Sequence, residues 1–239
     1  NALNAIAPAG QGHPEKDAYM AARGLRIWKS VFSGADSTRL VRVVGVQHGW
    51  PDNTGRVLQW LADNSPPGDP GCDMISPGGY FGLGDYSQVN SSTTVAQLIQ
   101  MAGNNYDGGP GANTLTSGDY ATQFGVEYCV YEGGSHVNNQ TGNSALDQLF
   151  RDVQLDEGMY ELYRRSFQTH VDSRVDCKVF LAYAYTTGVF GHIHDPMELN
   201  DWSKARLDHP KWRALLDFNA PKTSIAVRHN GTVVPADVI

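Results

Sequence analysis

Apolar residues recur along the chain with two different spacings, and the two kinds of segment alternate. Near-helical spacing marks the segment from Glu15 to Phe32, which Gly34 ends. The same spacing predicts helices over residues 54–64, 93–103, 144–172 (one helix or two) and 209–220. Between the helices lie short apolar runs, rich in β-branched and aromatic residues, which predict buried strands within residues 40–46, 72–82, 124–134 and 177–185.

Four strands that alternate with helices predict an α/β fold with a parallel sheet. A doubly wound open sheet and a (β/α) barrel both fit this pattern, and periodicity alone does not separate them. Glycine-rich and aromatic stretches follow the strands, so a site is expected at their carboxyl ends. No dinucleotide or P-loop glycine pattern follows a strand, which favours the barrel. Residues 1–220 are expected to form this unit, and residues 221–239 a linker or the start of a following domain.

Composition fits a globular enzyme or binding domain. The chain has 239 residues, of which 41% are hydrophobic and 18% charged, enough apolar residues for one large core. A net charge of -7, with no run of lysine or arginine, disfavours nucleic acid and anionic membranes as partners. No basic-then-apolar leader follows Asn1, so an export signal is expected outside these residues or not at all.

The three cysteines are too few and too scattered for a zinc pattern. Cys72, Cys129 and Cys177 are therefore expected as buried thiols, with a Cys72–Cys177 bridge left open.

The residues at the strand ends resemble the second half of a clan A glycoside hydrolase, a superfamily of retaining (β/α)8 enzymes. The segment "VEYCVYEGGSH" is similar to strand seven of that clan, with Glu132 at the place of the nucleophile. "ISPGGYFG" offers Tyr80 at the place of a strand-six tyrosine, and "TTGVFGH" offers Phe190 where a sugar platform, usually tryptophan, is expected. "HPKWRALLDF" resembles the closing helix of secreted relatives. The resemblance implies a secreted hydrolase acting on a polysaccharide or oligosaccharide.

One feature departs from the clan. Its acid/base residue belongs to an Asn-Glu pair that ends strand four, and no Asn-Glu pair occurs in this sequence. By the resemblance, the helix from Glu15 to Phe32 would be helix four, so the chain would supply strands five to eight. Half a barrel exposes unpaired strand edges. A partner is therefore expected: the amino-terminal half of the barrel, from the same precursor or another chain.

A retaining glycosidase needs two carboxyl groups about 5 to 5.5 Å apart, one of them ionised as the nucleophile. Glu132 suits the nucleophile, because a strand fixes its backbone, while Gly133 and Gly134 permit a sharp turn and leave room for substrate. The alternative is that Glu132 caps the next helix or pairs with an arginine. Glu127 competes within the strand, but its place near the amino-terminal end suits a structural pair with a lysine or arginine.

Four further residues are candidates for contacts with substrate near Glu132. Tyr80 is placed to donate a hydrogen bond to the nucleophile, or else to pack in the core. His48 offers a hydrogen bond to a sugar hydroxyl, and Trp50 offers a face for a sugar ring, or a cover for its own helix. His136 follows the glycines, either lining the cleft or lying on a surface loop.

"GHIHDP" raises a metal hypothesis, because His192 and His194 face the same way on an extended segment and Asp195 adds an oxygen. Two histidines without a clear third ligand favour substrate contacts instead, so neither a metal nor a cofactor is expected. The rival functions are a non-catalytic carbohydrate-binding barrel and, less favoured, a metal-dependent hydrolase built on this loop.

Overall fold

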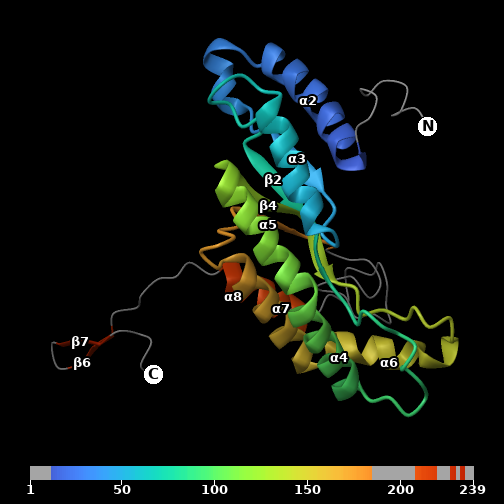
Figure 1. The fold of residues 1–239 in the computed structure, drawn as a ribbon. Helices are drawn as coiled ribbons and strands as arrows, with labels where there is room; N and C mark the ends of the chain where they lie inside the picture. Colours follow the sequence, from blue (N-terminus) through green and yellow to red (C-terminus); the bar gives the residue numbers. More distant parts are fainter. Residues whose placement is uncertain (1–11, 185–207, 220–226, 230–231, 235–239) are drawn as a thin grey trace.

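A computed structural model describes residues 12–184, 208–219, 227–229 and 232–234 (Figure 1). The helices are α2 (His13–Val31), α3 (Pro51–Asp63), α4 (Val95–Gly108), α5 (Pro110–Phe124), α6 (Asp147–Asp152), α7 (Glu157–His170) and α8 (Pro210–Asn219). Short 3-10 segments are η1 (Gly34–Arg39), η2 (Ser144–Leu146) and η3 (Val153–Leu155). The strands are β1 (Val43–Val46), β2 (Met74–Pro77), β3 (Gly79–Phe81), β4 (Glu127–Ser135), β5 (Val179–Ala182), β6 (Val227–His229) and β7 (Thr232–Val234).

The main sheet is parallel throughout, and its strands lie in chain order. β1 pairs with β2, β2 pairs with the start of β4, and β5 pairs with β4 on the other side. β3 follows β2 after Gly78 alone and pairs with the end of β4. The strand positions therefore run β1, β2–β3, β4, β5. In a doubly wound sheet the strand order reverses at a switch point, and the described strands show no such reversal. The predicted α/β fold with a parallel sheet is confirmed, while closure into an eight-stranded barrel remains a prediction.

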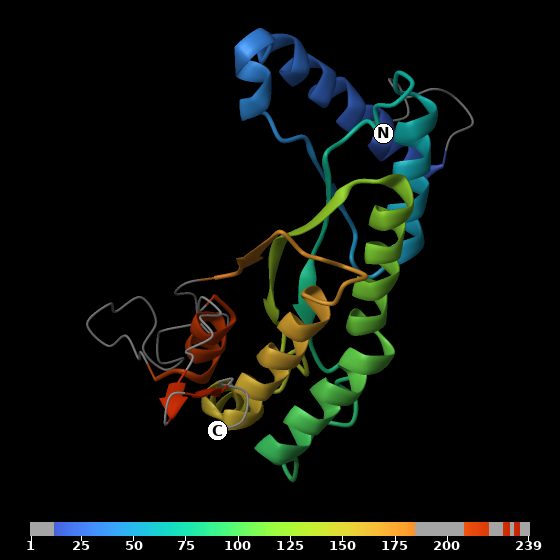
Figure 2. The same ribbon diagram turned by 90° about the vertical axis from the view of Figure 1, so that its left-hand side faces the viewer.

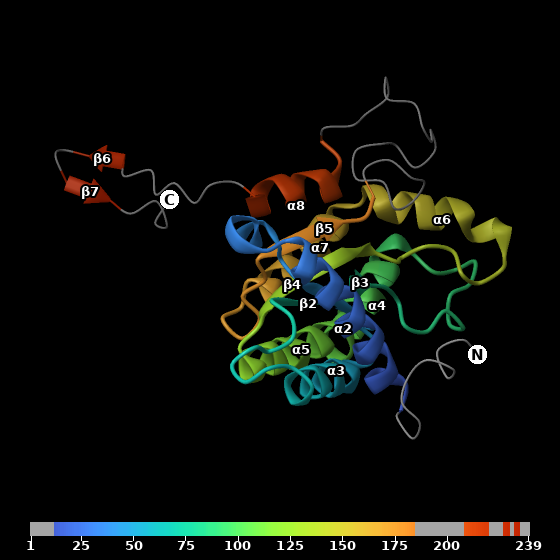
Figure 3. The ribbon, with the colours of Figure 1, turned by 90° about the horizontal axis from the view of Figure 1, so that it is seen from above.

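The helices cover the sheet in succession, because α2 contacts α3, α3 contacts α5, α5 contacts α7 and α7 contacts α8. In Figure 2, α3, α5 and α4 lie along one side of the strands, and Figure 3 shows α3 and α5 side by side. One core cluster joins β1, β2 and β4 to α2, α3 and α5, and includes Val44, Leu58 and Tyr128. A second cluster, including Phe150 and Phe167, lies between the end of the sheet and α4, α6 and α7.

Helix α5 is the element that the apolar pattern does not predict. Its buried positions carry small residues, namely Gly111, Thr114, Ser117, Gly118 and Ala121, so no apolar stripe marks the helix in the sequence. A side chain at Gly118 would lie 2.5 Å from the carbonyl oxygen of Arg174. The small face lets α5 approach the neighbouring backbone closely, which a larger apolar stripe would prevent.

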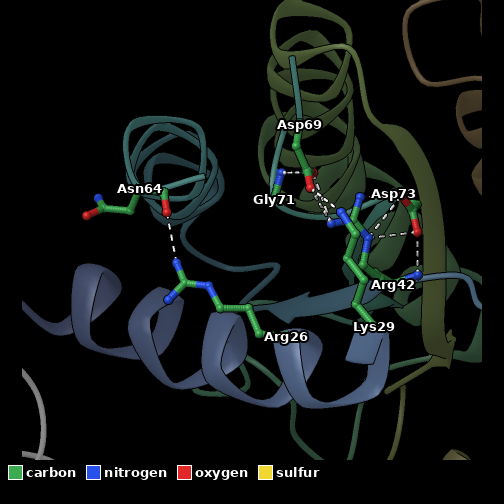
Figure 4. Close-up of polar contacts among 7 residues, drawn as sticks. All are labelled: Arg26, Lys29, Arg42, Asn64, Asp69, Gly71 and Asp73. Carbon is green, nitrogen blue, oxygen red and sulfur yellow. Dashed lines mark hydrogen bonds and ion pairs between the residues drawn. The ribbon is translucent and has the colours of Figure 1, made fainter. Parts of the chain in front are cut away.

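A network of charges closes the amino-terminal end of β1 and β2 (Figure 4). The Arg42 guanidinium lies 2.9 Å from an Asp69 oxygen and 2.7 Å from an Asp73 oxygen, and Lys29 of α2 reaches Asp69 at 2.7 Å. Burial raises the pKa of Asp69, but hydrogen bonds from Lys29, the Gly71 amide and Arg42 outweigh it and lower the pKa to about 2. The network ties α2 to the sheet.

Replacing Asp69 with asparagine is expected to lower the free energy of unfolding at pH 7 by on the order of 2 kcal/mol. The folded pKa lies below the ordinary value, so the stabilisation is present above that value and disappears as the pH falls toward 2. Urea unfolding of both proteins from pH 7 to pH 3 tests this, because their difference should shrink with acid. Asp36→Asn, in an exposed pair with Arg39, is the control expected to change little. A pH-independent difference would contradict the explanation.

The structure also bears on the cysteines, on membrane-spanning segments and on the carboxyl-terminal tail. All three cysteines are free thiols, so the Cys72–Cys177 bridge is not formed; Cys72 and Cys129 are buried and Cys177 is partly exposed. Among the described residues no helix is long and apolar enough to cross a membrane. In the tail, β6 and β7 pair antiparallel, and the division of the chain at residue 220 remains a prediction.

Candidate active site at the carboxyl end of β4

Glu132 lies at an irregularity near the carboxyl end of β4. Pairing with β5 follows one register at Val130 and another at Gly133, so Tyr131 and Glu132 occupy the shifted part of the strand. Glu132 is half-buried, and the neighbouring Tyr131 remains 46% exposed. Bulges of this kind redirect side chains at the ends of strands. The strand therefore presents a carboxylate that is held by the sheet and still reached by solvent.

Tyr80 of β3 lies beside the Glu132 side chain, close enough for the charge and hydrogen bonding of the carboxylate to act on the phenol. The two residues meet because β3 runs beside the end of β4, with Tyr80 opposite Gly134 in the register. Burial raises the pKa of Tyr80, and the charge and hydrogen bond of Glu132 raise it further. The phenol thus stays protonated and keeps a proton to donate. The two side chains are neighbours, while the hydrogen bond expected from the sequence and its role in catalysis remain predictions.

His136 completes a cluster of three side chains with Tyr80 and Glu132. Its ring stacks on Tyr80, with 4.0 Å between centroids and 27° between planes. Burial lowers the pKa of His136, and the charge of Glu132 opposes this shift only in part. The imidazole is therefore mostly neutral near pH 7. The structure places the His136 ring on Tyr80, where the charge of Glu132 reaches it, and contact of His136 with a substrate remains a prediction.

The backbone behind this cluster is fixed by hydrogen bonds. The His136 amide donates to the Phe81 carbonyl at 2.6 Å, and the Tyr86 hydroxyl donates to the His136 carbonyl at 2.7 Å. The Ser135 amide donates to the buried Tyr163 hydroxyl of α7 at 2.9 Å. These contacts hold the residues after Gly134 against β3 and α7, which keeps the His136 ring over Tyr80.

Gly133 and Gly134 follow Glu132, and glycine suits each position for a different structural reason. A side chain at Gly133 would lie 2.6 Å from the Phe180 ring and 2.8 Å from the Gly79 carbonyl oxygen, so close packing of β3, β4 and β5 requires glycine here. Gly134 has a φ of 147°, which favours glycine. The expectation that Gly133 leaves room for substrate is therefore wrong, because its open side faces protein.

His48 follows β1 and turns its ring toward α5. Nε2 lies 3.1 Å from the Pro110 carbonyl oxygen and 3.0 Å from the Thr114 hydroxyl, so it is engaged by the first turn of that helix. Burial lowers the pKa of His48, against a smaller opposing effect of the bond to Pro110. Nε2 of His48 is therefore already engaged by α5. A contact between His48 and a sugar remains a prediction.

Trp50 precedes α3 and is 39% exposed. Its ring lies 5.9 Å from the Arg56 guanidinium carbon, in a cation–π contact. With Tyr131, Trp50 lines a groove of about 860 Å³ that runs along β1. Trp50 thus contacts Arg56 of α3 and is also partly exposed in the groove, so its contact with a sugar ring remains a prediction.

The sequence raised two further hypotheses, a charged partner for Glu127 and a metal site on the loop with His192 and His194. Glu127 is exposed at the amino-terminal end of β4, and nearby Lys178 pairs with Asp176 instead. The charged pairing expected at that end is made by Arg42 with Asp69 and Asp73. Within the described ranges no group of three potential metal ligands occurs. Phe190, His192, His194 and Asp195 lie outside the described residues, so their predicted roles are untested.

Sequence reasoning missed two residues that shape the site. Tyr131 borders the groove beside Glu132, and its pKa is raised by burial and by the charge of Glu132. Thr114 orients His48 from a helix that the apolar pattern does not reveal. Strand alternation was the one available signal for Tyr131, because it places residues 127, 129 and 131 on one face; no sequence signal was available for Thr114.

Comparisons with known proteins add a distant likeness of fold. No family model matches the sequence, and no curated protein matches it. Among solved structures, the chain is similar to the GH51 arabinofuranosidase from Xanthomonas axonopodis pv. citri, at 15% identity and a TM-score of 0.46. The match covers 74% of this chain and 35% of that one. The chain therefore spans about a third of that protein's length.

On the hypothesis that Glu132 is a glycosidase nucleophile, replacing Tyr80 with phenylalanine is expected to lower turnover of an aryl glycoside by about 10- to 100-fold, since a hydrogen bond to a charged group contributes about 1.5–3 kcal/mol. The loss should fall mainly on kcat, because the hydroxyl contacts the candidate nucleophile. Steady-state kinetics measures it. The control is Tyr160→Phe, which removes a hydroxyl of α7 that donates to Asp217 of α8 at an exposed position. This variant should leave turnover unchanged. Equal effects of the two substitutions would contradict a role for Tyr80.

Proposed function

We propose that this chain carries the nucleophile of a retaining glycoside hydrolase that acts on a polysaccharide or oligosaccharide. The observation that carries the proposal is the cluster of Glu132, Tyr80 and His136 at the carboxyl edge of a parallel sheet. Carboxyl edges of such sheets are where (β/α) enzymes place their catalytic groups. The sequential strand order supports a segment of a (β/α)8 barrel, and the protein is proposed to be secreted.

In this proposal Glu132 attacks the anomeric carbon and forms a glycosyl–enzyme ester, which water then hydrolyses. Tyr80 donates to one carboxylate oxygen and so orients the other toward the sugar. Neutral His136 packs against Tyr80 and limits its movement, and Trp50 offers a ring face for a sugar. The acid that protonates the leaving oxygen is supplied by polypeptide outside this chain, which also completes the barrel.

Hydrolysis of a panel of aryl glycosides tests the proposal. Dinitrophenyl glycosides are suited to it, because their leaving group departs without a proton donor. Release of dinitrophenol, with a first-formed sugar of unchanged anomeric configuration by NMR, is the expected result. An inverted product would exclude the retaining mechanism. Binding of sugars without any release would favour a non-catalytic carbohydrate-binding barrel, and activity that chelators abolish would favour the His192 and His194 loop as a metal site.

A further inference from the structure

A pocket of about 290 Å³ lies at the amino-terminal end of the sheet, between α2 and the loop that connects α3 to β2. This volume is close to the lower end of the range for small-molecule sites, about 300–1,000 Å³. Three basic side chains line the pocket, Arg26 and Lys29 from α2 and Arg42 from just before β1, against one acidic side chain, Asp69. Glu132 lies near the opposite end of its strand, so the pocket is separate from the candidate active site.

The acidic side chain in this pocket is already satisfied by its neighbours. One oxygen of Asp69 accepts from the Gly71 amide and from Arg42, both at 2.9 Å, and the other oxygen accepts from Lys29 at 2.7 Å. Arg42 also binds Asp73 at 2.7 Å, so its charge is matched by two carboxylates. With Asp73 included, three cations face two carboxylates, which leaves one positive charge in excess.

Arg26 carries the excess charge. Its Nη2 donates to the Asn64 carbonyl at 2.8 Å, whereas Nε and Nη1 make no hydrogen bond to the residues described. A carbonyl has no formal charge, so this bond leaves the guanidinium without a counterion among those residues. Arg26 and Lys29 are three residues apart and rise from the same side of α2 toward the loop (Figure 4). Lys29 has two further N–H donors beyond the one that Asp69 accepts.

The rest of the pocket wall suits a small ligand with one charged end. Ala22, Leu25 and Pro66 are apolar, and Ser65 adds a hydroxyl. The chain as a whole carries a net charge of -7, so an anion would be held here by local donors and not by the overall field. A simpler explanation for the cations is that they complement the carboxyl end of α2, which ends at Val31. That explanation requires no ligand, and the experiments below separate the two.

We propose that this pocket binds a phosphate or sulfate group, either as the free ion or as part of a small ester. Arg26 donates to its oxygens through Nε and Nη1, and Lys29 donates through Nζ. The apolar wall contacts the organic part of an ester. A bound anion would link α2 to the loop before β2, next to the network of Arg42, Asp69 and Asp73. The inference does not depend on the proposed function.

Isothermal titration of the full chain with inorganic phosphate, at constant ionic strength, tests the site. Saturable binding at one site is expected, and Arg26→Gln should weaken it by at least about tenfold, because a hydrogen bond to a charged group contributes a factor of that order. Arg39→Gln is the control, since it removes the same charge from an exposed pair with Asp36 outside the pocket. No saturable binding, or equal weakening by both substitutions, would overturn the proposal.

The titration is repeated with glucose 6-phosphate to identify the source of the anion. Tighter binding than that of inorganic phosphate, with the same dependence on Arg26, would assign the pocket to an ester. Equal or weaker binding would assign it to the free ion. Ester binding that is insensitive to Arg26→Gln would place the ester elsewhere and overturn its assignment to this pocket.

Chemical labelling locates the anion on the natural chain, and decides the question should Arg26→Gln misfold. Phosphate at ten times its Kd should slow acetylation of Lys29 by about tenfold, because only the unoccupied site reacts. Lys178, which is paired with Asp176 on the surface, is the internal control and should react at an unchanged rate. Mass spectrometry measures both rates in one sample. Equal slowing at the two lysines, or none at Lys29, would show that phosphate does not occupy the pocket.

Discussion

Replacing Glu132 with glutamine is expected to lower turnover of dinitrophenyl glycosides by at least about 10³-fold, the order of loss that follows removal of a nucleophile. The amide keeps the size of the carboxylate and can still accept from Tyr80, so the fold and sugar binding should persist. Initial rates with purified variant and natural chain measure the effect, and the unfolding midpoint confirms that both are folded.

Glu127→Gln is the matched control for this experiment. Both residues lie on β4, but Glu127 is exposed at the amino-terminal end of the strand, far along it from the cluster with Tyr80. The control should keep nearly full turnover. Unchanged turnover in Glu132→Gln, or a comparable loss in both variants, would end the assignment of the nucleophile.

Replacing Gly133 with alanine is expected to destabilise the protein by about 3 kcal/mol or more, at the upper end of the cost of overpacking a core. The new methyl group would meet the Phe180 ring at 2.6 Å and the Gly79 carbonyl oxygen at 2.8 Å. The second contact is with backbone, which cannot rotate away, so β3 and β4 must separate. Urea unfolding measures the loss. Any folded fraction should also turn over substrate slowly, because β3 carries Tyr80.

Gly108→Ala provides the comparison for this substitution. Gly108 ends α4, and an added methyl group would meet nothing within 4 Å. Alanine has the higher helix propensity, so this variant should be neutral or slightly more stable. Similar stabilities of the two variants would show that close packing at Gly133 has been overstated.

The elements with strong apolar patterns were predictable from the sequence. β1 and β4 are rich in valine and tyrosine, and α2 and α3 carry apolar residues at helical spacing, so burial alone reveals them. Helix α5 was not predictable, because it packs through glycine, threonine and serine. The strand order was not predictable either, since pairing depends on contacts between distant segments.

The closeness of Glu132, Tyr80 and His136 could be expected from the sequence, but the detailed geometry around them could not. Strand ends of an α/β fold gather at one edge, which is why Glu132, Tyr80 and His136 could be expected together. The ring of His48 turns toward Thr114 because α5 lies there, and that helix was not predicted. Gly133 was read as an open approach, whereas Phe180, 47 residues later in the chain, fills the space.

Covalent labelling tests the central claim most directly. A panel of dinitrophenyl 2-deoxy-2-fluoro glycosides would trap the glycosyl–enzyme ester without needing a proton donor, because the leaving group departs unaided and the fluorine slows hydrolysis of the ester. The account predicts a single added sugar on the peptide that contains residues 126–136, located on Glu132 by mass spectrometry. A label on Glu127 or any other carboxylate, or hydrolysis of the parent glycosides with no label on the protein, would contradict it.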